Sequence, residues 1–289
     1  MKVSIELQRL CFSGTYVRYK VYTPGSGPVT RRACFVSSPV GDAECWDDLC
    51  RILASQGCLC VAFELPGFGH TPVRAPQDNP TRAAILWGVL DEVEISRGED
   101  PGRWHLVSHG SGCGVILEMA LTHPESVLSR TLISPVTHRF EKSMKQMLYS
   151  TRFGRWLCAT AYKRAEPRFD EKLLSLYGEP LDEARRSRLT REFCREGRLE
   201  TLWALFKDGY RHSRGAFSVE GPIMLIWGKN DSFGPRPDDK LLHALSEVEV
   251  HYITGYHMCM ETLPQETSEY LNGWFDHVEG RAKEPSIPG

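Results

Sequence analysis

Short, continuously apolar segments alternate along most of the chain with longer segments whose apolar residues recur at helical spacing. Residues 3–23 instead alternate apolar and polar positions, which predicts two strands joined by a hairpin turn at Ser13-Gly14. Further strands are predicted at 33–36, 58–63, 104–107, 131–133, 223–227 and 248–253. Helices are predicted at 46–56, which Gly57 would close, and at 81–95, 114–121 and 267–275.

Short apolar strands that alternate with helices are typical of a parallel sheet covered on both faces. The stretch 137–220 departs from this pattern because it contains helical periodicity and no convincing strand. We expect it to form a lid over the carboxyl ends of the strands. The predicted domains are a core of residues 1–136 and 221–278, a helical lid of residues 137–220 and a flexible tail of residues 279–289.

Composition places the chain among ordinary globular proteins. Hydrophobic residues make up 41% and charged residues 25% of its 289 positions, which excludes disordered, collagen-like and coiled-coil chains. The net charge of −2 indicates no general attraction to nucleic acid or to an anionic membrane. No apolar run approaches the roughly 20 residues that span a bilayer, and the N-terminal MKVSIELQRL lacks the apolar core of a secretory signal.

The ten cysteines are the unusual count. They are scattered along the chain, and with no secretory signal in view we interpret them as reduced, mostly buried thiols of a cytoplasmic protein. The histidines and cysteines lack metal-ligand spacing, and no glycine-rich phosphate loop follows the first strands. We therefore expect neither a metal nor an organic cofactor.

Residues 105–114, HLVSHGSGCG, have the order strand, tight turn of small residues, helix. This segment resembles the nucleophile elbow of the α/β-hydrolases. Residues 64–69, ELPGFG, resemble the glycine-containing turn of that family, WGKND at 227–231 resembles the segment with the triad acid, and GYH at 255–257 resembles the loop with the triad histidine. The resemblance implies an α/β-hydrolase fold, with a mostly parallel central sheet, helices on both faces and a helical lid insertion.

The elbow departs from the family pattern at the nucleophile. Aligned on the preceding strand and the following helix, the position of the serine holds Gly110. Making Ser111 the nucleophile would place His109 and Cys113 where small residues are needed, and Ser108 would lie inside the strand. Gly110 is therefore the predicted nucleophile position, and a glycine has no atom that can attack a carbonyl.

The loop after the predicted strand 33–36 departs as well. The family has a His-Gly pair there, followed by a backbone N–H of the oxyanion hole, whereas this chain has Ser37, Ser38 and Pro39. Proline has no N–H, and losing such a donor typically costs about 3–4 kcal/mol of transition-state stabilisation. The second donor, the N–H after the elbow position, is retained at Ser111, and a hydroxyl of Ser37 or Ser38 is a candidate replacement for the first.

The resemblance assigns His257 and Asp231 as a retained base and acid. A carboxylate beside an imidazole orients the ring and raises its basicity. The leading hypothesis is an enzyme in which His257 acts as general base on a small, mostly apolar substrate under the lid, without an acyl-serine intermediate. Lyase, cyclase, isomerase and water-activating hydrolase chemistry all fit. Candidate substrate contacts are Trp156, Trp203 and His109.

Two alternatives stay open. One is a non-catalytic, ligand-binding pseudo-hydrolase, and the other is a hydrolase that uses a nearby serine, Ser108 or Ser111. The expected partner is a small molecule, with no nucleic acid and no membrane, and no oligomeric state is predicted. In the lid, arginines at 188, 191, 195 and 198 recur at spacings of three and four, which predicts one helix face. That face is either solvated or guides an acidic substrate towards the cleft.

Overall fold

The structure of the chain is a computed structural model. It describes residues 2–12, 14–39, 41–71, 78–136, 151–165, 168–193, 198–204, 213, 215–216, 218–233, 242 and 248–280.

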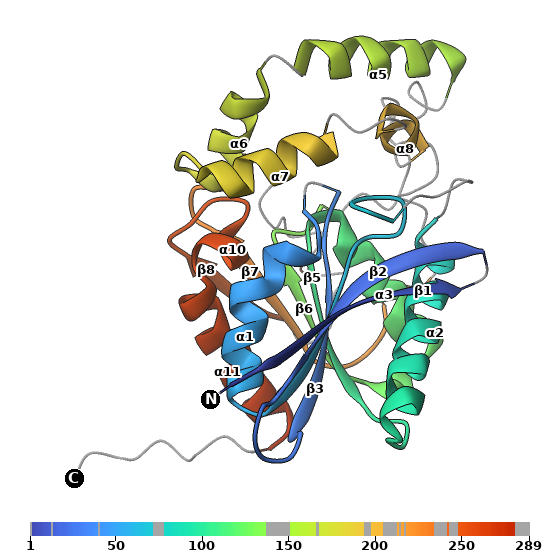
Figure 1. Cartoon of the computed structure of the whole chain (residues 1–289), viewed down its shortest axis with the longest axis vertical. Helices are drawn as coiled ribbons and strands as arrows, with labels where there is room; N and C mark the ends of the chain where they lie inside the picture. Colours follow the sequence, from blue (N-terminus) through green and yellow to red (C-terminus); the bar gives the residue numbers. More distant parts are fainter. Residues whose placement is uncertain are drawn as a thin grey trace.

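Within these residues, eight strands form one sheet in the order β1-β2-β4-β3-β5-β6-β7-β8 (Figure 1). The strands are β1 (Ser4–Phe12), β2 (Thr15–Thr23), β3 (Arg31–Val36), β4 (Cys58–Phe63), β5 (Trp104–His109), β6 (Val127–Ile133), β7 (Ile223–Gly228) and β8 (Val248–Ile253). Strand β2 pairs antiparallel with β1 and β4, and all other pairs are parallel. The predicted mostly parallel sheet is confirmed.

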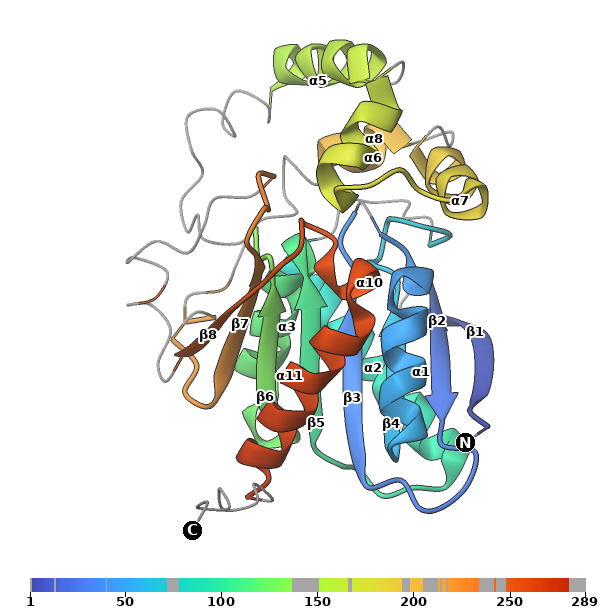
Figure 2. The same cartoon turned by 90° about the vertical axis from the view of Figure 1, so that its left-hand side faces the viewer.

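Helices cover both faces of the sheet (Figure 2). Helices α1 (Asp47–Ser55) and α11 (Pro264–Val278) lie on one face, and α2 (Asn79–Arg97) and α3 (Cys113–Thr122) lie on the other. Short helical turns lie at η1 (Ala43–Trp46), η2 (Gly110–Gly112), η3 (Pro124–Ser126) and α10 (Cys259–Thr262). All residues of β4, β5 and β7 are buried between these layers. This explains why β4 and β7 are apolar throughout, whereas β5 also buries the polar residues His105, Ser108 and His109.

Two element boundaries differ from the prediction for identifiable reasons. Helix α2 begins two residues before position 81 because the carboxylate of Asp78 accepts a hydrogen bond from the backbone N–H of Thr81 at 3.1 Å. Strand β6 begins before position 131 although it contains Arg130, which is buried. The guanidinium of Arg130 donates to the carbonyls of Val219 and Gly221 at 2.8 and 2.6 Å, so this charge is accommodated inside the strand.

Four lid helices lie beyond the carboxyl ends of the parallel strands (Figures 1 and 2). They are α5 (Arg152–Ala165), α6 (Phe169–Tyr177), α7 (Glu183–Phe193) and α8 (Arg198–Ala204). They belong to the stretch 137–220 for which the sequence predicts a lid. Its limits at 137 and 220 stay a prediction, because residues 137–150 and 205–212 lie outside the described residues, as does most of the predicted tail.

The cysteines are mostly buried, and the helices are those of a protein without a described membrane span. Of the nine cysteines that the structure describes, eight are buried and all nine are free thiols, which agrees with the interpretation as packing residues. Among the described helices, none combines the length and the apolar character needed to cross a bilayer.

Candidate active site

His257 and Asp231 form a buried pair at the carboxyl end of the sheet. Asp231 follows β7 and His257 follows β8, and parallel neighbours bring the two loops together. The Nδ1 atom of His257 lies 2.9 Å from Oδ2 of Asp231, with side-chain exposures of 1% and 0%. Because a carboxylate only accepts hydrogen bonds, Nδ1 carries a proton, and in the neutral form of the ring Nε2 is the nitrogen with the lone pair.

The carboxylate of Asp231 is held in its charged form. Burial opposes its ionisation most strongly, but the hydrogen bond and electrostatic interaction with His257, together with hydrogen bonds from Ser134 and Phe233, outweigh burial, so the pKa of Asp231 lies below its ordinary value. The backbone N–H of Phe233 also donates to Oδ1 at 2.9 Å, and the Phe233 ring lies 4.6 Å from the His257 ring. Sequence analysis did not single out Phe233, although an Asp that binds the N–H two residues later is a recognisable turn pattern.

Gly110 is the first residue after β5 and has a left-handed backbone, with φ +57°. A Cβ on Gly110 would lie 3.8 Å from Nε2 of His257 and 3.0 Å from the Cβ of Ser38. Gly112 also has no room for a side chain, because a Cβ there would lie 2.7 Å from the carbonyl oxygen of Ser37. The turn of small residues therefore brings the elbow against both the His257 loop and the loop after β3.

Ser38 and His109 form a second polar pair beside Gly110. The Oγ atom of Ser38 lies 3.1 Å from Nδ1 of His109, and Nε2 of His109 lies 3.1 Å from the carbonyl oxygen of His257. Since the carbonyl can only accept, Nε2 donates to it, and Nδ1 accepts the hydroxyl proton of Ser38. Burial holds the pKa of His109 well below its ordinary value, and the nearby His257 adds to this. His109 is therefore neutral. Both of its nitrogens bond protein groups here, and a contact of His109 with substrate stays a prediction.

The two serines in the loop after β3 have different hydrogen-bond partners. The Ser37 hydroxyl donates to the carbonyl of Phe63 at 3.0 Å and is tied to the sheet, so it is not a candidate donor to a ligand. Of the two serines proposed there, Ser38 is the one beside Gly110. The carbonyl of Pro39 accepts a hydrogen bond from the Arg198 guanidinium, which lies 4.8 Å above the Phe68 ring.

The remaining predicted site residues lie in less suitable places. Ser108 is fully buried within β5, and Ser111 lies in η2 with 8% of its surface exposed. Trp156 is 60% exposed on α5, so its position does not support the predicted substrate contact. Trp203 is partly buried in α8 under the guanidinium of Arg155, at 5.9 Å, and a role for it stays a prediction.

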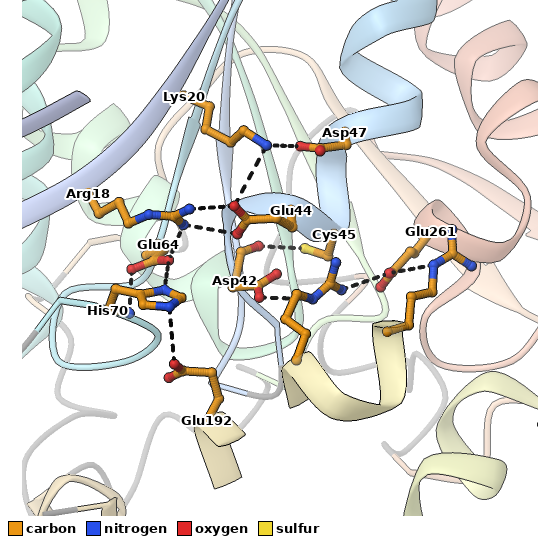
Figure 3. Close-up of polar contacts among 12 residues, drawn as sticks. Arg18, Lys20, Asp42, Glu44, Cys45, Asp47, Glu64, His70, Glu192 and Glu261 are labelled. Atoms are coloured by element: carbon orange, nitrogen blue, oxygen red, sulfur yellow. Dashed lines mark hydrogen bonds and ion pairs between the residues drawn. The ribbon is translucent and has the colours of Figure 1, made fainter. Parts of the chain in front are cut away.

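Polar contacts tie the lid to the loops around His257 and η1 (Figure 3). Arg188 of α7 lies 3.0 Å from Oδ2 of Asp42 and 3.0 Å from Oε1 of Glu261. The Tyr177 hydroxyl of α6 donates to Oε2 of Glu261 at 2.7 Å. Burial raises the pKa of Asp42 to about 7, although the charge of Arg188 acts in the opposite direction. The lid is thus anchored by a charge cluster that sequence periodicity did not reveal.

A second group of contacts in Figure 3 surrounds Glu64, whose side chain is fully buried. It accepts from the Arg18 guanidinium at 2.6 Å and from the backbone N–H of His70 at 2.7 Å. The Nε2 atom of His70 lies 3.5 Å from Oε1 of Glu192 on α7, which continues the contacts to the lid. Glu64 therefore holds the turn that follows β4.

The described lid arginines do not share one helix face, contrary to the prediction. Arg188 and Arg191 lie on α7, whereas Arg198 is the first residue of α8. Arg188 and Arg198 are engaged with core groups, whereas Arg191 is exposed. Arg195 lies outside the described residues.

A small cavity of about 40 Å³ lies between the lid and the loop after β3. Its lid side is mostly apolar, and its core side includes Pro39, Gly41 and Asp42. The lid residues that line it are Phe169, Leu173, Leu176, Leu189, Glu192, Phe193 and Arg198. The loop that contains His257 also contacts α6, because the backbone N–H of Met258 donates to the Leu176 carbonyl at 3.1 Å.

The sequence is similar to those of known hydrolases over most of its length. The sequence profile of the alpha/beta hydrolase family matches residues 21–269, and the chain belongs to that family. It is 22% identical over 229 residues to the uncharacterized hydrolase YugF of Bacillus subtilis, covering 73% of this chain and 78% of that protein. It is 25% identical over 252 residues to a 2-hydroxy-6-oxononadienedioate/2-hydroxy-6-oxononatrienedioate hydrolase of Paraburkholderia phymatum, covering 82% and 83%.

Solved structures agree on the fold. The crystal structure of Cfl2 from Burkholderia cenocepacia superposes with a TM-score of 0.78 at 19% identity, covering 94% of this chain and 96% of that one. The haloalkane dehalogenase DbeA from Bradyrhizobium elkani gives a TM-score of 0.73 at 18% identity, covering 96% and 100%. The predicted α/β-hydrolase fold is confirmed, and the relatives' hydrolase activities support an enzymatic role for this chain.

Proposed function

We propose that this protein is an α/β-hydrolase-family enzyme that acts on a small organic substrate by His257 general-base chemistry, without an acyl-serine intermediate. One observation carries the proposal. Asp231 orients His257 at 2.9 Å, while the position 3.8 Å from Nε2, where a side chain at residue 110 would begin, belongs to a glycine. The site has a base and its orienting acid, and the elbow residue that faces them has no nucleophilic atom.

In this proposal Nε2 of His257 removes a proton from a water molecule or from a C–H or O–H group of the substrate. The charged Asp231 stabilises the imidazolium that results and keeps Nε2 directed at the site. If water is activated, its oxygen attacks an electrophilic carbon of the substrate, the bond from that carbon to the leaving group breaks, and His257 returns the proton to the leaving group, so the reaction is a hydrolysis. If a substrate proton is taken, the outcome is elimination, cyclisation or isomerisation, with the proton returned by His257 to the product or leaving group.

We propose a partly apolar substrate, because the lid wall beside Pro39 is mainly leucine and phenylalanine. The relative from Paraburkholderia phymatum acts on a 2-hydroxy-6-oxo dienedioate. Compounds of that type, simple esters, enol-lactones and epoxides therefore make a suitable first panel. Product formation is followed by mass spectrometry, and incorporation of oxygen from ¹⁸O-water identifies hydrolysis.

The deciding variant is His257→Ala, with His277→Ala as its control. His277 is an exposed residue of α11. We expect His257→Ala to reduce turnover of any active compound at least about a hundredfold, the usual contribution of a positioned general base, and His277→Ala to leave it unchanged. Undiminished turnover by His257→Ala would rule the proposal out. Tight binding without any product across the panel would favour the ligand-binding alternative.

A second candidate function, hydrolysis through a relocated serine, is favoured by one contact. Oγ of Ser38 donates to Nδ1 of the neutral His109, whose other nitrogen is held by a carbonyl. In that mechanism Oγ attacks an ester carbonyl, its proton passes to Nδ1, and His109 returns the proton to the leaving alcohol. A water molecule then attacks the acyl-Ser38 carbonyl, which releases the acid product and restores the serine hydroxyl. A fluorophosphonate probe distinguishes the two functions. Labelling of the wild type that Ser38→Ala removes would establish the relocated serine, and absence of labelling supports the general-base proposal.

A further inference from the structure

Helix α5 is the outermost element of the lid, on the side remote from the sheet (Figures 1 and 2). It carries two large aromatic side chains, Phe153 and Trp156, which are 57% and 60% exposed. Their rings stack on each other with centroids 5.6 Å apart. Single exposed apolar residues are common on protein surfaces, whereas adjoining exposed aromatic side chains are typical of a surface that binds a partner or a membrane.

The aromatic pair shares its side of the helix with cations. At 3.6 residues per turn, Arg152, Phe153, Trp156, Lys163 and Arg164 fall within about one third of the helix circumference. All five are exposed. We call this set the α5 face.

The opposite side of α5 holds the helix on the lid. Gly154 and Cys158 are buried there. The Tyr162 hydroxyl donates to the carbonyl of Phe193, and the Tyr162 and Phe193 rings stack at 4.8 Å. The α5 face therefore points away from the groups that anchor the helix.

Charge distinguishes α5 from the rest of the chain. Its sequence, RFGRWLCATAYKRA, contains four Arg and Lys residues and no acid, whereas the whole chain has a net charge of −2. Arg155 pairs with Glu200 at 3.2 Å. Arg152, Lys163 and Arg164 form no ion pair with any residue that the structure describes.

We propose that the α5 face docks the protein on the surface of an anionic phospholipid bilayer. Trp and Phe side chains insert at the boundary between headgroups and acyl chains, and flanking Lys and Arg side chains pair with acidic headgroups. Peripheral docking of this kind requires no spanning helix. The sequence predicted no membrane partner because the net charge of the whole chain is close to zero. A net charge does not reveal that basic residues are concentrated on one helix, as they are on α5. The proposal is independent of the chemistry at His257.

The test uses the full chain and sedimentation with lipid vesicles. Vesicles of phosphatidylcholine alone are compared with vesicles that contain about 30% phosphatidylserine, a composition that carries a negative surface potential. We expect binding to the anionic vesicles only, weakened at high salt because exposed charges are screened. Two double variants, F153A/W156A and K163E/R164E, should each lower the partition coefficient at least about tenfold.

Ile95→Ala is the matched control, because Ile95 is 69% exposed but lies on α2 of the core. It should bind like the wild type. All of the substituted side chains are exposed, so unchanged circular dichroism and melting temperature will show that the variants fold. Equal binding by the wild type and both double variants would overturn the proposal. Concentration-dependent self-association that F153A/W156A abolishes, without vesicle binding, would also overturn it and assign the α5 face to a second copy of the chain.

Discussion

The Cβ of Ser38 lies 3.0 Å from the point where a Cβ on Gly110 would stand. The loop after β3 and the elbow after β5 are therefore fitted to each other, and the Ser38 side chain occupies space that a side chain at position 110 would enter. Two departures from the family pattern that are 72 residues apart in sequence meet at one place in the structure.

This relationship predicts that restoring a serine at the elbow needs a second change. In Gly110→Ser the new Cβ meets Ser38 and the left-handed backbone adds strain of about 1–3 kcal/mol. In G110S/S38G the steric contact is removed and the new hydroxyl lies within reach of His257. We expect fluorophosphonate to label position 110 faster in G110S/S38G than in G110S, as measured by peptide mapping. Equal labelling rates would show that Ser38 does not obstruct this position.

A Gly112→Ala substitution should be destabilising because the added methyl would lie 2.7 Å from a backbone oxygen of Ser37, which cannot move independently. We expect the free energy of unfolding to fall by about 1–3 kcal/mol, the usual effect of overpacking. Gly273→Ala in α11 is the opposite case, since a Cβ there has nothing within 4 Å. It should stabilise the protein by roughly 0.5–1 kcal/mol. Urea denaturation measures both, and a stabilised Gly112→Ala would refute the packing described for the elbow.

Removing Arg188 should loosen the lid and cost stability. Asp42 and Glu261 are 1% and 4% exposed, and Arg188→Ala would leave the first without its ion-pair partner. We expect a loss of about 3 kcal/mol, near the lower limit for breaking a buried pair, because the guanidinium is partly exposed. Arg191→Ala on the same helix is the control, since Arg191 is exposed and bonds only a serine hydroxyl among the described residues. Similar losses in the two variants would contradict an anchoring role for Arg188.

The pH dependence of stability should report on Asp42. Its pKa is about 7 in the folded protein, and an unfolded Asp titrates near 3.9. Between these values the folded state holds a proton that the unfolded state has released, so the stability that this group contributes is complete below about pH 4 and is lost as the pH rises through 7. Asn does not titrate, so the stability of Asp42→Asn does not fall with pH through this group. The melting temperature of the variant relative to wild type should therefore increase from pH 5 to pH 8, and a constant difference would show that Asp42 titrates normally.

The parts of the fold that could be predicted are those with local causes. Strands such as Cys58–Phe63 are apolar throughout because both of their faces are covered, and this is visible in sequence alone. The left-handed Gly57 after α1 was also predictable, because a glycine just after helical periodicity commonly ends a helix in this conformation. Resemblance to the family added His257 and Asp231, whose pairing depends on neighbouring strands that are separated along the chain.

The lid shows where local reasoning fails. Arginine spacing from 188 to 198 predicts one helix face, but Arg188 lies on α7 and Arg198 on α8. The two side chains bind different parts of the core, at Asp42 and at Pro39. Trp156 was predicted to contact substrate, and instead it faces outwards beside Phe153. Helical periodicity indicates which residues share a face, and it does not indicate which neighbour that face meets.

The sequence by itself determined the layered α/β architecture, the absence of a side chain at residue 110 and the absence of an N–H at Pro39, because these follow from periodicity and from the covalent chemistry of glycine and proline. Only the tertiary structure decided that Ser38 fills the space beside Gly110, that Ser37 is tied to Phe63, and that Asp42 and Glu261 share Arg188. These contacts join segments far apart in the chain. Their existence depends on how the loops at one edge of the sheet pack together, and no local pattern records that packing.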